Sequence, residues 1–167
     1  MSAHNPSAMG ATGQPAPANP KSAVPIYVAV CSLVIILALV LGVGLAVNQV
    51  LRHLVQTAPF CVAVVLGFRR SRAAYWVALP LFLFWLVLMA LIWAYLLGIS
   101  HIVNGHFSPI EIGMTIVVGV AGILGIASLA GSKSSLSLAT KLGLFIAFLA
   151  VQLVCLRISF LPSIAHR

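Results

Sequence analysis

The sequence predicts an all-α protein, a polytopic bundle of apolar helices that cross a membrane. Three observations predict this class: 62% of the 167 residues are hydrophobic, only 6% are charged, and long apolar runs recur along the chain. A soluble domain is about 45–50% apolar and about 25% charged. Nine basic side chains and one acidic side chain cannot cover the surface of a water-soluble domain of this length, so a soluble globular fold is excluded.

The bundle is expected to occupy residues 25–161, between two tails. Residues 1–24 are rich in Pro, Ala, Gly and Ser and show no apolar period. We expect this segment to be disordered, because it cannot bury enough apolar surface to offset the entropy lost on ordering. Residues 162–167 form a short C-terminal tail after the last apolar run.

The preferred interpretation has five spans, of which the second is short. Their approximate ranges are 25–47, 57–69, 73–98, 109–130 and 138–160. The first apolar run extends for about 33 Å as a helix, which is enough for a hydrocarbon core of about 30 Å. Trp76 and Trp93 lie near opposite ends of the third run, where interfacial aromatic side chains are expected in a spanning helix.

The segment 48–72 allows two interpretations. In the preferred one, the first helix continues to about Gln56, the chain turns at residues 57–59, and a short span returns to the arginines that follow. Pro59 then occupies a first helical turn, where its missing N–H is harmless. In the alternative, the whole segment is an interfacial connector and the bundle has four spans.

The fourth span has a well-defined start. Ser108, Pro109 and Glu111 occupy the positions of an N-cap, a first-turn proline and the third helical residue. This pattern predicts a capping box, in which the serine and the glutamate each bond to the other's backbone N–H.

Small residues recur at helical spacing on two spans and predict helix packing. Because lipid supplies no hydrophobic drive between helices, small side chains favour close approach of two backbones. The residues concerned are Ala38, Gly42 and Ala46 on the first span, and Gly119, Gly122 and Gly125 on the fourth.

The basic residues predict an orientation. If the spans alternate, one side of the membrane carries Arg69, Arg70, Arg72, Lys133 and Lys141. By the positive-inside rule this side is cytoplasmic, which places the C-terminus outside. We expect an integral protein of a bacterial cytoplasmic (inner) membrane. The net charge of +8 does not indicate nucleic-acid binding, because the basic residues punctuate apolar runs rather than cluster on a soluble face.

Few residues are available for chemistry. Glu111 is the only acid, which excludes sites that need several carboxylates. With His53, His101 and His106, which lie near span ends, it makes a weak candidate metal site. The spacing of these residues has little specificity, so we predict no metal, no cofactor and no catalytic residue.

These observations predict a non-catalytic integral membrane protein, either an accessory subunit or a small packing scaffold. Its expected partners are the lipid bilayer and either another membrane protein or further copies of the same chain. The alternative is an oligomeric transporter or channel for a small solute. The scarcity of polar residues within the spans counts against this alternative.

Overall fold

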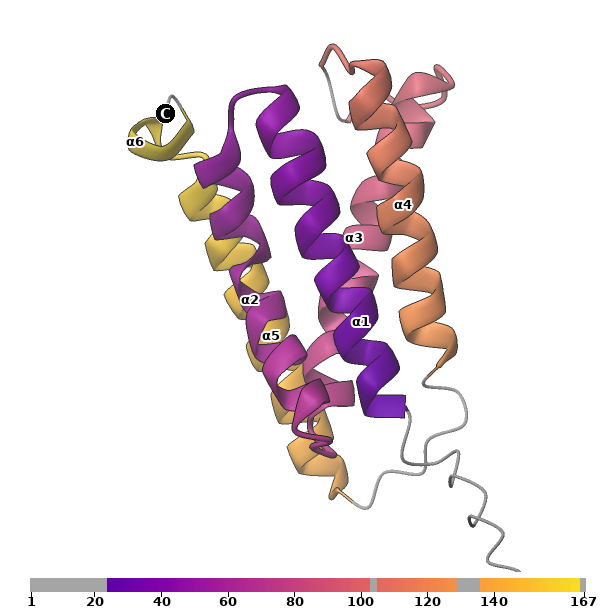
Figure 1. The fold of residues 1–167 in the computed structure, drawn as a ribbon, viewed down its shortest axis with the longest axis vertical. Coiled ribbons are helices and arrows are strands. Elements are labelled where there is room, and N and C mark those ends of the chain that lie inside the picture. The colour runs from indigo at the N-terminus through magenta and orange to yellow at the C-terminus, as the bar shows by residue number, and fades with distance from the viewer. Residues whose placement is uncertain (1–23, 103–104, 129–135, 166–167) are drawn as a thin grey trace, which may run out of the picture.

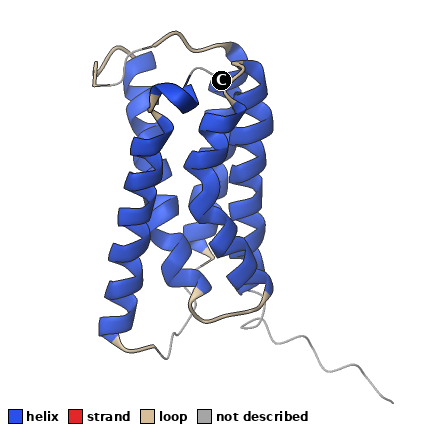
Figure 2. Ribbon diagram, turned by 90° about the vertical axis from the view of Figure 1, so that its left-hand side faces the viewer, coloured by secondary structure: helices blue, strands red, loops and turns tan. Residues whose placement is uncertain are grey.

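The computed structural model describes residues 24–102, 105–128 and 136–165, which form a bundle of helices without strands (Figures 1 and 2). Five of the helices in these ranges are long and apolar enough to cross a membrane, as the sequence predicted. They are α1 (Val24–Leu37) with its π-helical continuation η2 (Ala38–Gly44), α2 (Val50–Phe68), α3 (Ala74–Leu96), α4 (Pro109–Ala127) and α5 (Leu138–Ser159). A short helix, α6 (Pro162–Ala165), follows within the predicted C-terminal tail. The predicted tail up to residue 23 lies outside the described residues.

The second helix corrects the sequence interpretation. It begins at Val50 and has 19 residues, so it is not short, and the chain does not turn at residues 57–59. The turn lies at Asn48, whose backbone is left-handed with φ 52°. The N–H of Gln49 bonds to the carbonyl of Gly44 at 2.8 Å, and the N–H of Asn48 bonds to that of Leu45. These two bonds form a Schellman motif, which asparagine tolerates better than most residues.

Pro59 therefore lies inside α2, where it removes one backbone hydrogen bond of the helix. Polar side chains also join α2 to α5 three residues before this position. The amide nitrogen of Gln152 donates to the backbone carbonyl of Gln56 at 3.1 Å, and the amide nitrogen of Gln56 donates to the Ser159 hydroxyl at 2.9 Å. Gln152 therefore bonds across helices, as an amide side chain inside a membrane helix commonly does.

The core lies around α3, in whose most apolar stretch 44% of the residues are buried. Phe82 on α3 and Phe60 on α2 are fully buried, with ring centroids 5.8 Å apart. By contrast, only 11% of the corresponding stretch of α5 is buried. The α5 helix therefore presents most of its surface to the surroundings of the molecule.

The crossing of α1 and α2 involves a glycine that the small-residue stripes did not include. A Cβ atom on Gly67 of α2 would lie 2.6 Å from the backbone oxygen of Pro25 and 2.7 Å from the Cβ of Ala29, both on α1. Backbone atoms cannot yield as a flexible side chain can. Gly67 therefore sets the approach of α1 to α2.

The predicted packing residues have different environments. A Cβ on Gly125 or Gly122 would press against α3, at 2.6 Å from the Phe82 ring or 3.1 Å from the Leu86 side chain. A Cβ on Gly42 would press against Met114, and Ala38 is buried.

Ala46 and Gly119 differ from the expectation. Ala46 is exposed, and a Cβ on Gly119 would meet no atom within 4 Å. Gly119 is three residues before Gly122 and six before Gly125. Around the axis of α4 it therefore points away from the face that meets α3.

One end of the bundle carries most of the described basic residues. Arg69, Arg70 and Arg72 belong to the connection from α2 to α3, and Lys141 lies in the first turn of α5. The Lys141 ammonium lies 5.5 Å from the centroid of the Trp76 ring near the start of α3, so these segments meet. Lys133 lies outside the described residues.

Candidate ligand pocket

A cavity of about 530 Å³ opens at the opposite end of the bundle. Its walls come from the end of the first helix, the start of α2, the second half of α3, the start of α4 and the end of α5 (Figure 1). This volume lies in the range of small-molecule sites, about 300–1,000 Å³. The polar side chains among its lining residues are Gln49, Arg52, His53, Gln56, His106, Glu111 and Thr115.

The α2 wall carries a cation and an imidazole. The Arg52 guanidinium donates to the Gln49 side-chain oxygen at 2.8 Å and lies 4.3 Å from the centroid of the Phe160 ring. The Nδ1 atom of His53 bonds to the backbone oxygen of Gln49 at 3.0 Å. Because that oxygen only accepts, Nδ1 carries the hydrogen, and Nε2 of the neutral ring is an acceptor.

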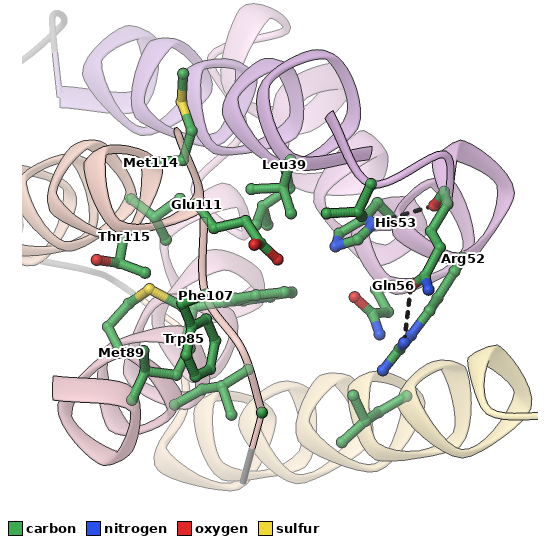
Figure 3. Close-up of a pocket in the computed structure, with 18 of the residues that line it drawn as sticks. Leu39, Arg52, His53, Gln56, Trp85, Met89, Phe107, Glu111, Met114 and Thr115 are labelled. Carbon is green, nitrogen blue, oxygen red and sulfur yellow. Dashed lines mark hydrogen bonds between the residues drawn. The ribbon is translucent and has the colours of Figure 1, made fainter. Parts of the chain in front are cut away.

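The α4 wall carries the only acid of the chain. Oε2 of Glu111 accepts from the Ser108 N–H at 2.7 Å, and the Ser108 hydroxyl accepts from the Glu111 N–H at 3.3 Å. This is the predicted capping box, and it is confirmed. The cap fixes the carboxylate at the first turn of α4, from where it reaches into the cavity toward the His53 ring (Figure 3).

One turn further along α4, Thr115 is already bonded. Its hydroxyl donates to the Ile112 carbonyl at 2.7 Å and accepts from the Trp93 indole N–H at 3.0 Å. Thr115 therefore joins α4 to α3 and has little capacity left for a ligand.

The deep part of the cavity is apolar. Leu39 and Val43 of η2 face Trp85, Met89 and Ile92 of α3 across it. Trp85 is 3% exposed, and its indole N–H has no hydrogen-bond partner among the described residues. No local sequence pattern predicts this apolar region, because its walls come from segments far apart in the chain.

The four candidate metal ligands do not form one group. His53, His106 and Glu111 line the pocket, whereas His101 is exposed and stands edge-on to Tyr95, with ring centroids 6.2 Å apart. No three His, Cys, Asp or Glu side chains of the described residues are placed to hold a metal ion together. In the sequence, the four candidate ligands share only a position near the ends of spans. That position does not show which of them come together in the fold.

Comparison of the chain with protein-family models, with curated proteins and with solved structures finds no match.

Proposed function

We propose that this chain is a five-span integral membrane protein, and a non-catalytic one, which acts as an accessory subunit by packing against a partner membrane protein through α5. The observation that carries this proposal is the exposed face of α5. Its members recur at alternating spacings of four and three residues: Ala139, Gly143, Ile146, Ala150 and Leu153 are all exposed.

Small residues on this face favour a helix over lipid as the neighbour. Ala139, Gly143 and Ala150 leave space between the larger Ile146 and Leu153, and a Cβ on Gly143 would meet nothing within 4 Å. A 4–3 spacing keeps one seam facing a partner helix, as in left-handed helix pairs. Small residues in such a seam let two backbones approach and gain dispersion contacts that lipid tails do not supply.

The test is purification from native membranes in a mild detergent, followed by measurement of the assembly's mass and composition. We expect a stoichiometric partner that is lost in Gly143→Leu, because the added side chain would separate the backbones. Gly119→Leu is the matched control, since Gly119 is equally open but lies on α4. A partner retained by Gly143→Leu, or a monomeric wild-type protein, would contradict the proposal. A homo-oligomer lost in the same variant would show that the partner is a second copy.

A second candidate is an oligomeric transporter or channel for a small solute, and the polar pocket favours it. The pocket opens at one end of the bundle, whereas the middle is filled by buried aromatic rings such as Phe60 and Phe82. Transport would require these helices to separate. Solute flux in liposomes that contain only this protein would favour the transporter over the accessory subunit.

The proposal includes an orientation in a bacterial cytoplasmic membrane. The end that carries Arg69, Arg70, Arg72 and Lys141 faces the cytoplasm, and the end with the pocket and α6 faces outward. The support is the bias of basic residues between the two ends of the bundle.

A further inference from the structure

We propose that the pocket binds an organic ammonium ion that carries an apolar body. This proposal is independent of the packing of α5. It depends on the proposed membrane insertion only for the route by which a ligand reaches the pocket. The inference is carried by the hydrogen-bond acceptors that converge on the cavity, by the unpaired charge of Glu111 and by the apolar floor.

Acceptors from two helices face the cavity. On α4, Glu111 uses Oε2 for its cap and retains Oε1. On α2, His53 offers Nε2, and Gln56, whose nitrogen is bound to Ser159, offers Oε1. Figure 3 shows the Glu111 carboxylate, the His53 ring and the Gln56 amide oxygen turned toward the space between them. An ammonium group has three N–H donors and no acceptor, which matches this set.

No Lys or Arg of the described residues pairs with the negative charge of Glu111. Among those residues Arg52 is the only Lys or Arg that lines the cavity, and its guanidinium bonds to Gln49 and lies over the Phe160 ring on the α5 side. Arg52 and Glu111, which are both described, form no ion pair. A partly desolvated carboxylate without a partner favours the arrival of a cation. The ring of Phe107, beside Glu111 in Figure 3, adds an aromatic surface that cations also favour.

The size and the floor of the cavity favour an organic cation over a metal ion. Zinc and copper need several ligand atoms at about 2.0–2.3 Å from one point, and the described His, Cys and Glu side chains provide no such group. A cavity of about 530 Å³ also leaves most of its space to something larger than an ion. Leu39, Trp85 and Ile92 would cover the apolar body of the ligand, which makes the expected ligand an amphiphilic amine.

The experiment uses dansylcadaverine, a primary alkylamine with an apolar fluorophore, and the full-length protein in a neutral maltoside detergent. We expect saturable binding by fluorescence anisotropy with one site per chain. The N-acetylated probe has the same body but no charge, so we expect it to bind at least about tenfold more weakly. Equal binding of the two probes, or binding that does not saturate, would overturn the proposal.

Two pairs of variants locate the site. Glu111→Gln removes the charge but keeps a side chain that can complete the cap, so affinity should fall at least about tenfold. Ser108→Ala weakens the cap and keeps the charge, so affinity should change by less than about threefold. His53→Ala should weaken binding, whereas His101→Ala, outside the pocket, should not. Unchanged affinity in folded Glu111→Gln would overturn the proposal even if other variants fail to fold.

Competition identifies the source of the ammonium group. Displacement of the probe by decylamine, but not by decanol, would assign the site to free amines. Displacement by short-chain phosphatidylethanolamine alone would assign it to a lipid head group. Failure of both amines to compete would overturn the proposal. Because the assay uses the isolated protein, loss of the α5 partner does not affect it, and the two proposals can fail separately.

Discussion

Glu111 has two roles that a pair of substitutions can separate, because its carboxylate both caps α4 and lies in the pocket. We predict that Ser108→Ala lowers the free energy of unfolding by about 1 kcal/mol, the usual cost of losing an N-cap. Glu111→Gln should cost less, since glutamine also accepts from the N-cap N–H. Unfolding in mixed detergent measures both. If Glu111→Gln is more destabilising than Ser108→Ala, the negative charge of Glu111 stabilises the fold by more than its role in the cap explains.

Three helices in the bundle end in the same way, in a Schellman motif with one residue in the left-handed conformation. These residues are Asn48, Arg70 and Gly98, with φ of 52°, 53° and 72°. At each, the N–H of the next residue bonds to the carbonyl five residues earlier, as from Ser71 to the Leu66 carbonyl at 2.9 Å. The three motifs close the connections that turn the chain back into the bundle. Only Gly98 is the residue type that this conformation favours.

The Schellman motifs predict two substitutions whose effects on the free energy of unfolding have opposite signs. Arg70→Gly should raise the free energy of unfolding by about 0.5–1 kcal/mol, because glycine avoids the strain of a left-handed backbone. Gly98→Ala should lower it by about 1 kcal/mol for the same reason. Melting temperature in detergent measures both. A destabilised Arg70→Gly would mean that the arginine side chain contributes more than its backbone strain costs.

At the scale of the whole molecule, the crossing of α1 and α2 brings a glycine of one helix against the backbone of the other. We predict that Gly67→Ala destabilises the bundle by about 1–3 kcal/mol, because the added methyl group would meet the Pro25 carbonyl and the Ala29 Cβ. Gly119→Ala is the matched control, because a Cβ on Gly119 would meet no atom within 4 Å. This change should be neutral or slightly stabilising. Equal stability of the two variants would show that α1 can move away from α2 without loss.

The orientation of the molecule has its own test. In a protein whose Cys31, Cys61 and Cys155 are replaced by alanine, Ser100→Cys should react with an impermeant thiol reagent on intact cells. Ser71→Cys, within the arginine-rich connection, should react only after the cells are permeabilised, since the proposed orientation places that end in the cytoplasm. Labelling of Ser71→Cys alone on intact cells would reverse the orientation.

Features that depend on neighbouring residues could be predicted from the sequence. The apolar runs and the Ser108–Glu111 cap are set within one helix or one turn, so their patterns are complete in a short segment. The turn before α2 was misplaced because Pro59 is a strong local helix breaker. The structure continues α2 through Pro59, and the bonds that join this part of α2 to Gln152 and Ser159 of α5 come from a distant part of the chain that no local pattern includes.

The sequence by itself determined that the chain is a bundle of apolar helices with its few charges near their ends, and it preferred five spans over four. That the second of these helices is as long as a full span was decided by the structure. The tertiary structure alone decided which glycines meet a neighbour, such as Gly67 but not Gly119, and which polar side chains share one cavity. The physical reason is that contacts between helices depend on the rotation and approach of each helix. Those are set by packing over the whole bundle and not by the residues of any single segment.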